Sequence, residues 1–201
     1  MQGMKYVKIL VEEIHSTTAA TIGEDGRPQT RAIDMMLYDE NGVYFLTAKG
    51  KAFYQQLMEQ QFLALSGTKD KKAVSLRGKI KNIGSEKLDE IVEKNTYMQQ
   101  IYPGDTRDAL EVFCLHEAQG EYFDISDPSH IVRETIIIGD AEEKKNGYFV
   151  TGKCMGCKLC YWVCPQKCID ISKKPVEIDQ KHCLHCGKCF EICPKRAIIK
   201  R

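Results

Sequence analysis

The sequence has no long hydrophobic run, and this absence excludes one class of protein. None of its 201 residues belongs to an uninterrupted apolar stretch of the roughly 18 residues that a membrane-spanning helix needs. The first residues also lack the pattern of a secretion signal, because lysines and glutamates interrupt the short apolar segment there. We therefore predict a cytoplasmic location and no membrane partner.

Cysteine is nearly absent from most of the chain and crowded at its end. Nine of the ten cysteines lie within residues 154–201, so they belong to one local part of the chain. A disulfide framework requires an oxidising compartment, which nothing at the N-terminus indicates. The pattern C-x-x-C-x-x-C-x-x-x-C-P occurs twice, starting at Cys154 and again at Cys183. This internal repeat indicates a metal-binding module.

The spacing of the repeat favours iron–sulfur clusters over zinc. Three thiolates within seven residues can surround one face of a cubane, and the fourth cysteine of each run then binds the other cluster. Structural zinc commonly uses separated C-x-x-C pairs, which the triplets fit poorly. The module resembles the bacterial two-cluster ferredoxins over residues 148–201. The predicted ligands of two [4Fe-4S] clusters are Cys154, Cys157, Cys160 and Cys193 for the first, and Cys183, Cys186, Cys189 and Cys164 for the second.

Two cysteines fall outside this ligand set. Cys168 takes the place that Ala197 has in the second half of the repeat, and we expect a small packing residue there. Cys114 lies in a short apolar run and is expected in the core.

Net charge is also nearly absent, at +1, but it is unevenly divided. Residues 146–201 carry eleven Lys or Arg against four Asp or Glu, a net charge of +7. A basic module often indicates nucleic-acid binding. Here the lysines can instead offset the negative charge of two thiolate-bound clusters, and no stacking aromatics accompany them. We therefore predict no nucleic-acid partner.

Residues 1–143 have the pattern of a mainly β domain, and residues 144–201 form a smaller second domain. Apolar residues at helical spacing predict helices at residues 3–14, 51–60 and 85–94, the last capped by Ser85. Alternation and turn signals predict strands at residues 16–22, 29–38, 43–47, 62–67, 74–83, 111–116, 121–125 and 135–138. Many short strands with a few helices predict an α+β fold, mainly β, built on a barrel.

Residues 24–51 carry a resemblance to a known family. The points of match are Asp25-Gly26, Pro28, Arg31 followed by Ile33, the Tyr38-Asp39-Glu40 hairpin and Phe45-x-Thr47. In their order and spacing they resemble the FMN-binding split barrel of the pyridoxamine 5′-phosphate oxidase superfamily. The resemblance implies bound FMN and a homodimer.

The flavin phosphate needs fixed cations and hydrogen-bond donors at a helix N-terminus. Arg31, Thr47, Lys49 and Lys51 have the chemistry and the positions to supply them, although such residues alone are more often solvated surface groups. The resemblance further implies that the strand backbone of Ala32, Ile33 and Asp34 lies along the isoalloxazine edge.

The sequence also departs from the oxidase itself. Met36 stands where the oxidase has a lysine, and Ala52-Phe53 replaces its Arg-Lys pair at the helix start. No Arg-x-His motif, which the oxidase uses to hold its substrate, occurs anywhere. We therefore predict that the chain is no true pyridoxamine 5′-phosphate oxidase.

These features predict an oxidoreductase that passes electrons between [4Fe-4S] clusters and FMN, with hydride transfer to or from a small organic substrate. A redox protein or a small molecule would be its electron donor or acceptor. One alternative is an electron-transfer adaptor between proteins with no substrate of its own; another is a barrel that binds a different flavin-like or tetrapyrrole ligand. The sequence assigns no catalytic residue, and the candidate proton donors Tyr102, His116 and His130 are each more often structural.

Overall fold

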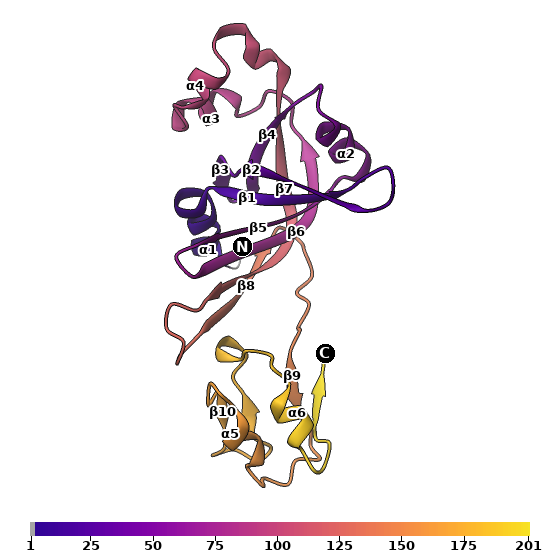
Figure 1. Ribbon diagram of the computed structural model, residues 1–201, viewed down its shortest axis with the longest axis vertical. Coiled ribbons are helices and arrows are strands. Elements are labelled where there is room, and N and C mark those ends of the chain that lie inside the picture. Colours follow the sequence, from indigo (N-terminus) through magenta and orange to yellow (C-terminus); the bar gives the residue numbers. More distant parts are fainter. Residues whose placement is uncertain (1–2) are drawn as a thin grey trace. The chain divides into compact units, whose positions relative to one another are not determined.

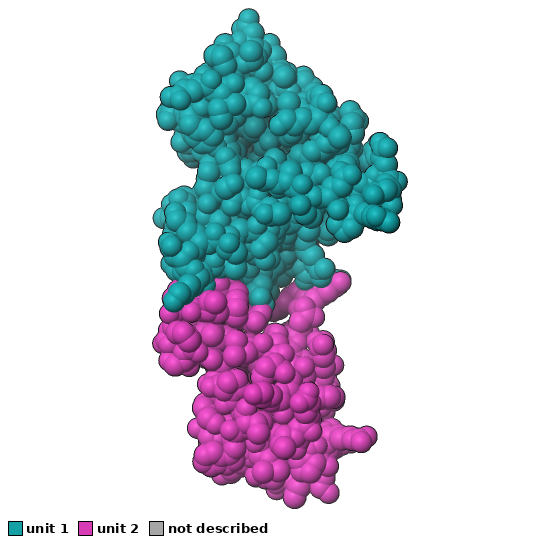
Figure 2. Space-filling model, in the orientation of Figure 1, with its two compact units in different colours: residues 1–122, 135–142 teal, residues 123–134, 143–201 magenta. Residues whose placement is uncertain are grey.

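The computed structural model describes residues 3–201 and divides the chain into two compact units. The first unit consists of residues 1–122 and 135–142, and the second of residues 123–134 and 143–201 (Figure 2). The second unit thus combines the C-terminal module with a short segment from the end of a long β-hairpin. No helix among the described residues is long and apolar enough to cross a membrane.

An eight-stranded antiparallel sheet forms the first unit and curls into a barrel-like body (Figure 1). The strand order is β2-β1-β5-β6-β7-β4-β3, with β8 paired to β7. The strands are β1 (Ser16–Ile22), β2 (Pro28–Asp34), β3 (Leu37–Asp39), β4 (Gly42–Ala48), β5 (Phe62–Lys69), β6 (Lys72–Asn82), β7 (Leu110–Asp124) and β8 (Val132–Ile138). The predicted mainly β class is confirmed.

The single strand predicted at residues 29–38 is wrong, because the chain there changes partners. Strand β2 pairs with β1 along its whole length, whereas β3 pairs with β4. Met35 and Met36 lie between the two strands and are both buried, at 0% and 4% exposed. Two successive buried side chains do not fit the alternation of a half-buried strand, and they mark the point where the chain leaves one neighbour for the next.

The two strands predicted at residues 111–116 and 121–125 are a single strand, β7. No break separates them, and Gly120 lies within the strand. A Cβ at Gly120 would lie 1.9 Å from the carbonyl oxygen of Ser75, and one at Gly78 would lie 2.0 Å from that of Glu117. Glycine at both positions therefore allows β6 and β7 to approach each other closely.

Four helices and two irregular turns accompany the sheet. They are α1 (Met4–Lys8), the π-helical η1 (Ile9–Ile14), α2 (Ala52–Gln60), α3 (Leu88–Lys94), α4 (Met98–Ile101) and the 3₁₀ turn η2 (Gly104–Ala109). The predicted side-chain cap by Ser85 is wrong. Helix α3 begins after Lys87, which has a positive φ of 63°, and Ser85 contributes only its carbonyl oxygen to the preceding turn.

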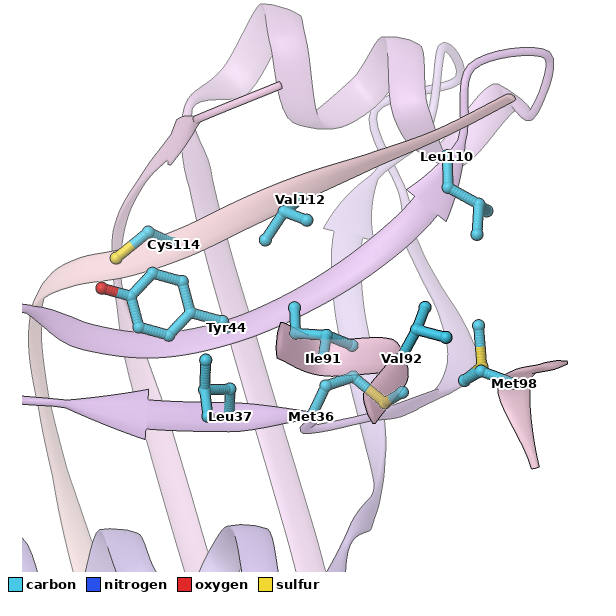
Figure 3. Close-up of a cluster of buried hydrophobic side chains, with 9 residues drawn as sticks. All are labelled: Met36, Leu37, Tyr44, Ile91, Val92, Met98, Leu110, Val112 and Cys114. Carbon is cyan, nitrogen blue, oxygen red and sulfur yellow. The ribbon is translucent and has the colours of Figure 1, made fainter. Parts of the chain in front are cut away.

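One hydrophobic cluster joins α3 and α4 to the sheet (Figure 3). Its buried members are Met36, Leu37, Tyr44, Ile91, Val92, Met98, Leu110, Val112 and Cys114. Cys114 is 0% exposed, as expected of a core residue. The cluster fixes the β3–β4 hairpin and the start of β7 against the helices, because burial of apolar surface is the main stabilising contribution in such a core.

The second unit is a small module with two-fold repeated structure. Its elements are β9 (Tyr148–Val150), α5 (Leu159–Val163), β10 (Ile169–Asp170), β11 (Glu177–Ile178), η3 (Gln180–His182), α6 (Lys188–Ile192) and β12 (Ile198–Lys200). Strand β9 pairs with β12, and β10 pairs with β11. The five-residue helices α5 and α6 stand at matching places in the two halves of the repeat.

The end of the β7–β8 hairpin, residues 123–134, packs within this same unit. Ile131 donates its amide to Gln166 at 3.1 Å, and its carbonyl oxygen accepts from Nδ1 of His182 at 2.7 Å. Lys181 pairs with Glu134 at 3.0 Å. We call residues 123–134 the hairpin tip below.

Candidate functional site

The first group of predicted cluster ligands surrounds one cavity. Cys154, Cys157, Cys160 and Cys193 all line one cavity at the N-terminal end of α5. Three of them come from the first half of the repeat, and Cys193 comes from the end of the second half. We call this the first cavity.

The second group surrounds a separate cavity. Cys183, Cys186 and Cys189 line it together with Cys164 from the first half of the repeat. We call this the second cavity. The fold thus brings the eight cysteines together in the same two sets of four that the spacing predicts.

Matching backbone geometry in the two halves places the third cysteine of each triplet. Lys158 and Gly187 occupy equivalent positions and both have positive φ, at 62° and 79°. A left-handed residue at this position reverses the chain after the second cysteine and begins the short helix that carries Cys160 or Cys189. Both helix-borne cysteines are buried, at 8% exposed each.

Cys168 lies beside the second cavity and Ala197 beside the first. The sulfur of Cys168 is 3.6 Å from that of Cys164. Since four other cysteines already line the same cavity, this position agrees with a packing residue next to the ligands.

In the barrel, Arg31 reaches from the edge strand β2 to helix α2. Its guanidinium donates to Thr21 at 2.5 Å and to Oε1 of Gln56 at 3.0 Å, and it lies 4.3 Å from the ring centroid of Phe53. Burial lowers its pKa, but an arginine stays protonated at neutral pH. Arg31 is therefore a fixed cation beside α2.

Thr47 supplies the test of whether this region fits an anionic group. It lies near the end of β4 and is 2% exposed, and its buried Oγ1 has no hydrogen-bond partner. Buried polar atoms are rarely left without a partner unless a ligand or water supplies one. Helix α2 follows directly, and no side chain caps its N-terminus at Lys51. The residues present therefore fit a phosphate group at the start of α2.

The two lysines of the predicted site differ in their surroundings. Lys51 is exposed at the N-cap of α2. The Lys49 ammonium instead lies 3.9 Å from the carboxylate of Glu111. Hydrogen bonds from Asn82 and Tyr54 lower the pKa of that carboxyl and keep it charged.

Asp34, at the end of β2, belongs to a polar network that the sequence did not reveal. The Tyr97 hydroxyl donates to Asp34 at 2.8 Å and lies 3.0 Å from Nε2 of His15. Burial, and then the hydrogen bond to Asp34, raise the pKa of Tyr97. The neighbouring Ile33 accepts from the Thr17 hydroxyl at 2.8 Å, and Ala32 is exposed on the edge strand.

The sequence patterns therefore missed four neighbours of the site, which are Thr21, Gln56, His15 and Tyr97. Gln56 carried the clearest signal, because it is a polar side chain on the inner face of a helix and is only 8% exposed. His15 and Tyr97 are separated by 82 residues, and no local pattern joins them.

The candidate proton donors named from the sequence do not gather around this site. Tyr102 packs against the hydrophobic cluster of Figure 3, and the His130 ring lies 3.7 Å from that of His182 in the second unit. His116 lies 3.8 Å from the Glu117 carboxylate.

The fold and the site define a redox protein that joins a flavin-binding type of barrel to an iron–sulfur module. The chain belongs to the pyridoxamine 5′-phosphate oxidase family, whose profile matches residues 5–122. The profile of the 4Fe-4S dicluster domain matches residues 153–197. Both resemblances expected from the sequence are thereby confirmed.

Solved structures show the same barrel. A NimC/NimA family protein of Clostridium acetobutylicum superposes with a TM-score of 0.56 at 20% identity, covering 68% of this chain and 94% of that one. A protein of the same bacterium related to general stress protein 26 gives 0.52 at 19% identity, covering 67% and 94%. PhzG from Burkholderia lata gives 0.50 at 14% identity, covering 68% and 89%. These identities establish the fold alone. No curated protein matches the chain in sequence.

Proposed function

We propose that the chain is an oxidoreductase in which two [4Fe-4S] clusters exchange single electrons with FMN held by the barrel. The observation that carries this proposal is the sorting of eight cysteines into two cavities, each lined by four of them. In this proposal Cys154, Cys157, Cys160 and Cys193 hold the first cluster. Cys183, Cys186, Cys189 and Cys164 hold the second.

The barrel residues have separate roles in holding FMN. Arg31 and the Thr47 hydroxyl bind the phosphate at the start of α2, and Lys51 adds positive charge there. The backbone of residues 32–34 lies along the isoalloxazine edge. When bound, FMN joins the one-electron chemistry of the clusters to two-electron hydride transfer with a small organic substrate.

The departures at Met36 and Ala52-Phe53 support an activity other than that of the oxidase. Its substrate-holding Arg-x-His motif is also missing. The substrate class of this chain is therefore set by other residues around the flavin.

The test is anaerobic purification followed by iron, sulfide and flavin analysis of the same sample. We expect about eight irons and one FMN for each chain, and reoxidation of the reduced protein by an organic acceptor. Cluster absorption without flavin would refute the FMN site. Flavin and clusters that exchange electrons only with other redox proteins, in a screen of organic acceptors, would establish the adaptor function instead.

A further inference from the structure

The two halves of the cysteine repeat match in sequence spacing, but their cavities differ in charge. The first cavity is lined by Lys158 and Lys195 besides its cysteines and apolar groups. The second cavity has no charged side chain in its lining. When the two halves of the repeat are aligned, Gly187 takes the place of Lys158, and Gln166 takes the place of Lys195.

The hairpin tip binds the side of the module that holds the second cavity. Gln166 and His182 both bind the tip at Ile131, the first through its side-chain oxygen and the second through Nδ1. Arg133 of the tip donates to the carbonyl oxygen of Cys183, itself a predicted ligand, at 3.2 Å. This side of the module is therefore already engaged by a segment that continues into β7 and β8.

The equivalent positions beside the first cavity face solvent. Lys195 is the repeat equivalent of Gln166, and Lys153 is that of His182; both lysines are exposed. Met155 and Leu159 at the rim of the first cavity are 53% and 43% exposed, and Cys157 is exposed beside them. The first cavity thus has an apolar, accessible rim with positive charges, and no carboxylate lines it.

We propose that this rim is the docking surface for an acidic one-electron carrier protein, and that the chain exchanges electrons with this carrier at the first cluster. The rim consists of Met155, Cys157, Lys158, Leu159 and Lys195. The inference rests on the proposed function in requiring assembled clusters. An apolar centre with a polar rim is the usual composition of a non-obligate protein interface, and the lysines select a partner of opposite charge.

The electron balance of the exchange is simple. The carrier's metal centre loses one electron, the first cluster gains it, and no bond forms and no proton moves. The second cluster then accepts that electron from the first. The reverse sequence returns it to the carrier.

The experiment measures electron exchange between the anaerobically purified protein and a plant-type [2Fe-2S] ferredoxin, an acidic protein, by stopped-flow absorbance. At roughly 0.1 M salt, charges farther than about 10 Å from the interface are largely screened. We expect the double variant Lys158→Glu/Lys195→Glu to lower the second-order rate constant by about tenfold or more. Added salt should slow the unaltered protein and have little effect on the variant.

The matched control is Lys188→Glu/Lys200→Glu, which makes the same change in charge at two exposed lysines outside the first cavity. Its rate constant should stay within about twofold of the unaltered protein. Reduced methyl viologen, a small cation, should reduce the clusters of every variant, which shows that the clusters are assembled.

Three outcomes would overturn the proposal: an unchanged rate in Lys158→Glu/Lys195→Glu, an equal loss in the control, or reduction by viologen with no exchange with ferredoxin. The measurement follows the clusters and not the flavin. A sample without FMN therefore refutes the flavin part of the proposed function while still testing the docking surface.

Discussion

At the scale of single residues, we expect the Thr47 hydroxyl to contribute to ligand binding and not to the stability of the fold. Its hydroxyl is buried without a partner, so it costs free energy in the unliganded protein and contributes only when a ligand accepts its hydrogen bond. A residue with this property is more informative about function than a charged one, because no other interaction accounts for it.

We predict that Thr47→Val leaves the stability of the flavin-free protein unchanged or slightly higher and weakens FMN binding by about tenfold or more, the value of a hydrogen bond to a charged group. Thermal unfolding of the flavin-free protein and a fluorescence titration with FMN measure the two effects. A variant that loses stability but keeps its FMN affinity would show that the hydroxyl serves the fold alone. Thr68→Val, at an exposed threonine of β5, is the control.

Glu111 gives a prediction of pH dependence. Hydrogen bonds from Asn82 and then Tyr54 lower its pKa in the folded protein. The unfolded carboxyl titrates near pH ~4.3. Its contribution to stability is therefore present above that pH and is lost as the pH falls through the lower folded pKa.

Glu111→Gln should consequently reduce the acid sensitivity of folding. We expect the free energy of unfolding of this variant, from urea titrations, to change less than that of the unaltered protein as the pH falls below about 4.3. The exposed Glu59→Gln serves as the matched control and should keep the original pH dependence. Identical pH profiles for Glu111→Gln and the unaltered protein would contradict this role.

At the scale of elements, the repeat makes each half of the module depend on the other. Cys193 follows α6 yet lines the cavity of the first triplet, and Cys164 follows α5 yet lines that of the second.

We predict that Cys193→Ala removes the cluster bound by Cys154, Cys157 and Cys160 and leaves the other largely intact. Cys164→Ala should do the reverse, and Cys168→Ala should retain both. Iron analysis and electron paramagnetic resonance of the reduced proteins distinguish the three cases. Loss of only the second cluster from Cys193→Ala would refute the crossed assignment.

The elements also show how far sequence patterns reach. The cysteine spacing pointed to the two sets of four that line the two cavities, because each triplet lies within seven residues and the repeat supplies the crossed fourth cysteine. That these sets bind clusters stays a prediction. The strand pattern failed at Met35–Met36, where the chain changes its partner strand. It also failed at Gly120, where β7 approaches β6 closely. The link between His15 and Tyr97 was equally invisible, since tertiary packing alone joins two residues so far apart in the chain.

At the scale of the whole molecule, the homodimer implied by the barrel's resemblance remains a prediction. Strand β2 lies at the edge of the sheet, and its first residues are exposed, so a partner could cover it. We expect a dimer in size-exclusion chromatography with light scattering at micromolar concentration. A monomer in the presence of bound FMN would contradict the prediction and would leave each chain to hold its flavin alone.

The hairpin tip has a consequence for how such a chain can be rearranged in evolution or by engineering. A cut at the change of composition near residue 143 would strip Ile131 and Arg133 of the groups they bind, and would leave Gln166 and His182 without theirs. A module moved to another protein would need residues 123–134 with it, or other side chains in place of Gln166 and His182. This chain is therefore no simple fusion of two interchangeable parts, since part of its second unit is encoded inside its first.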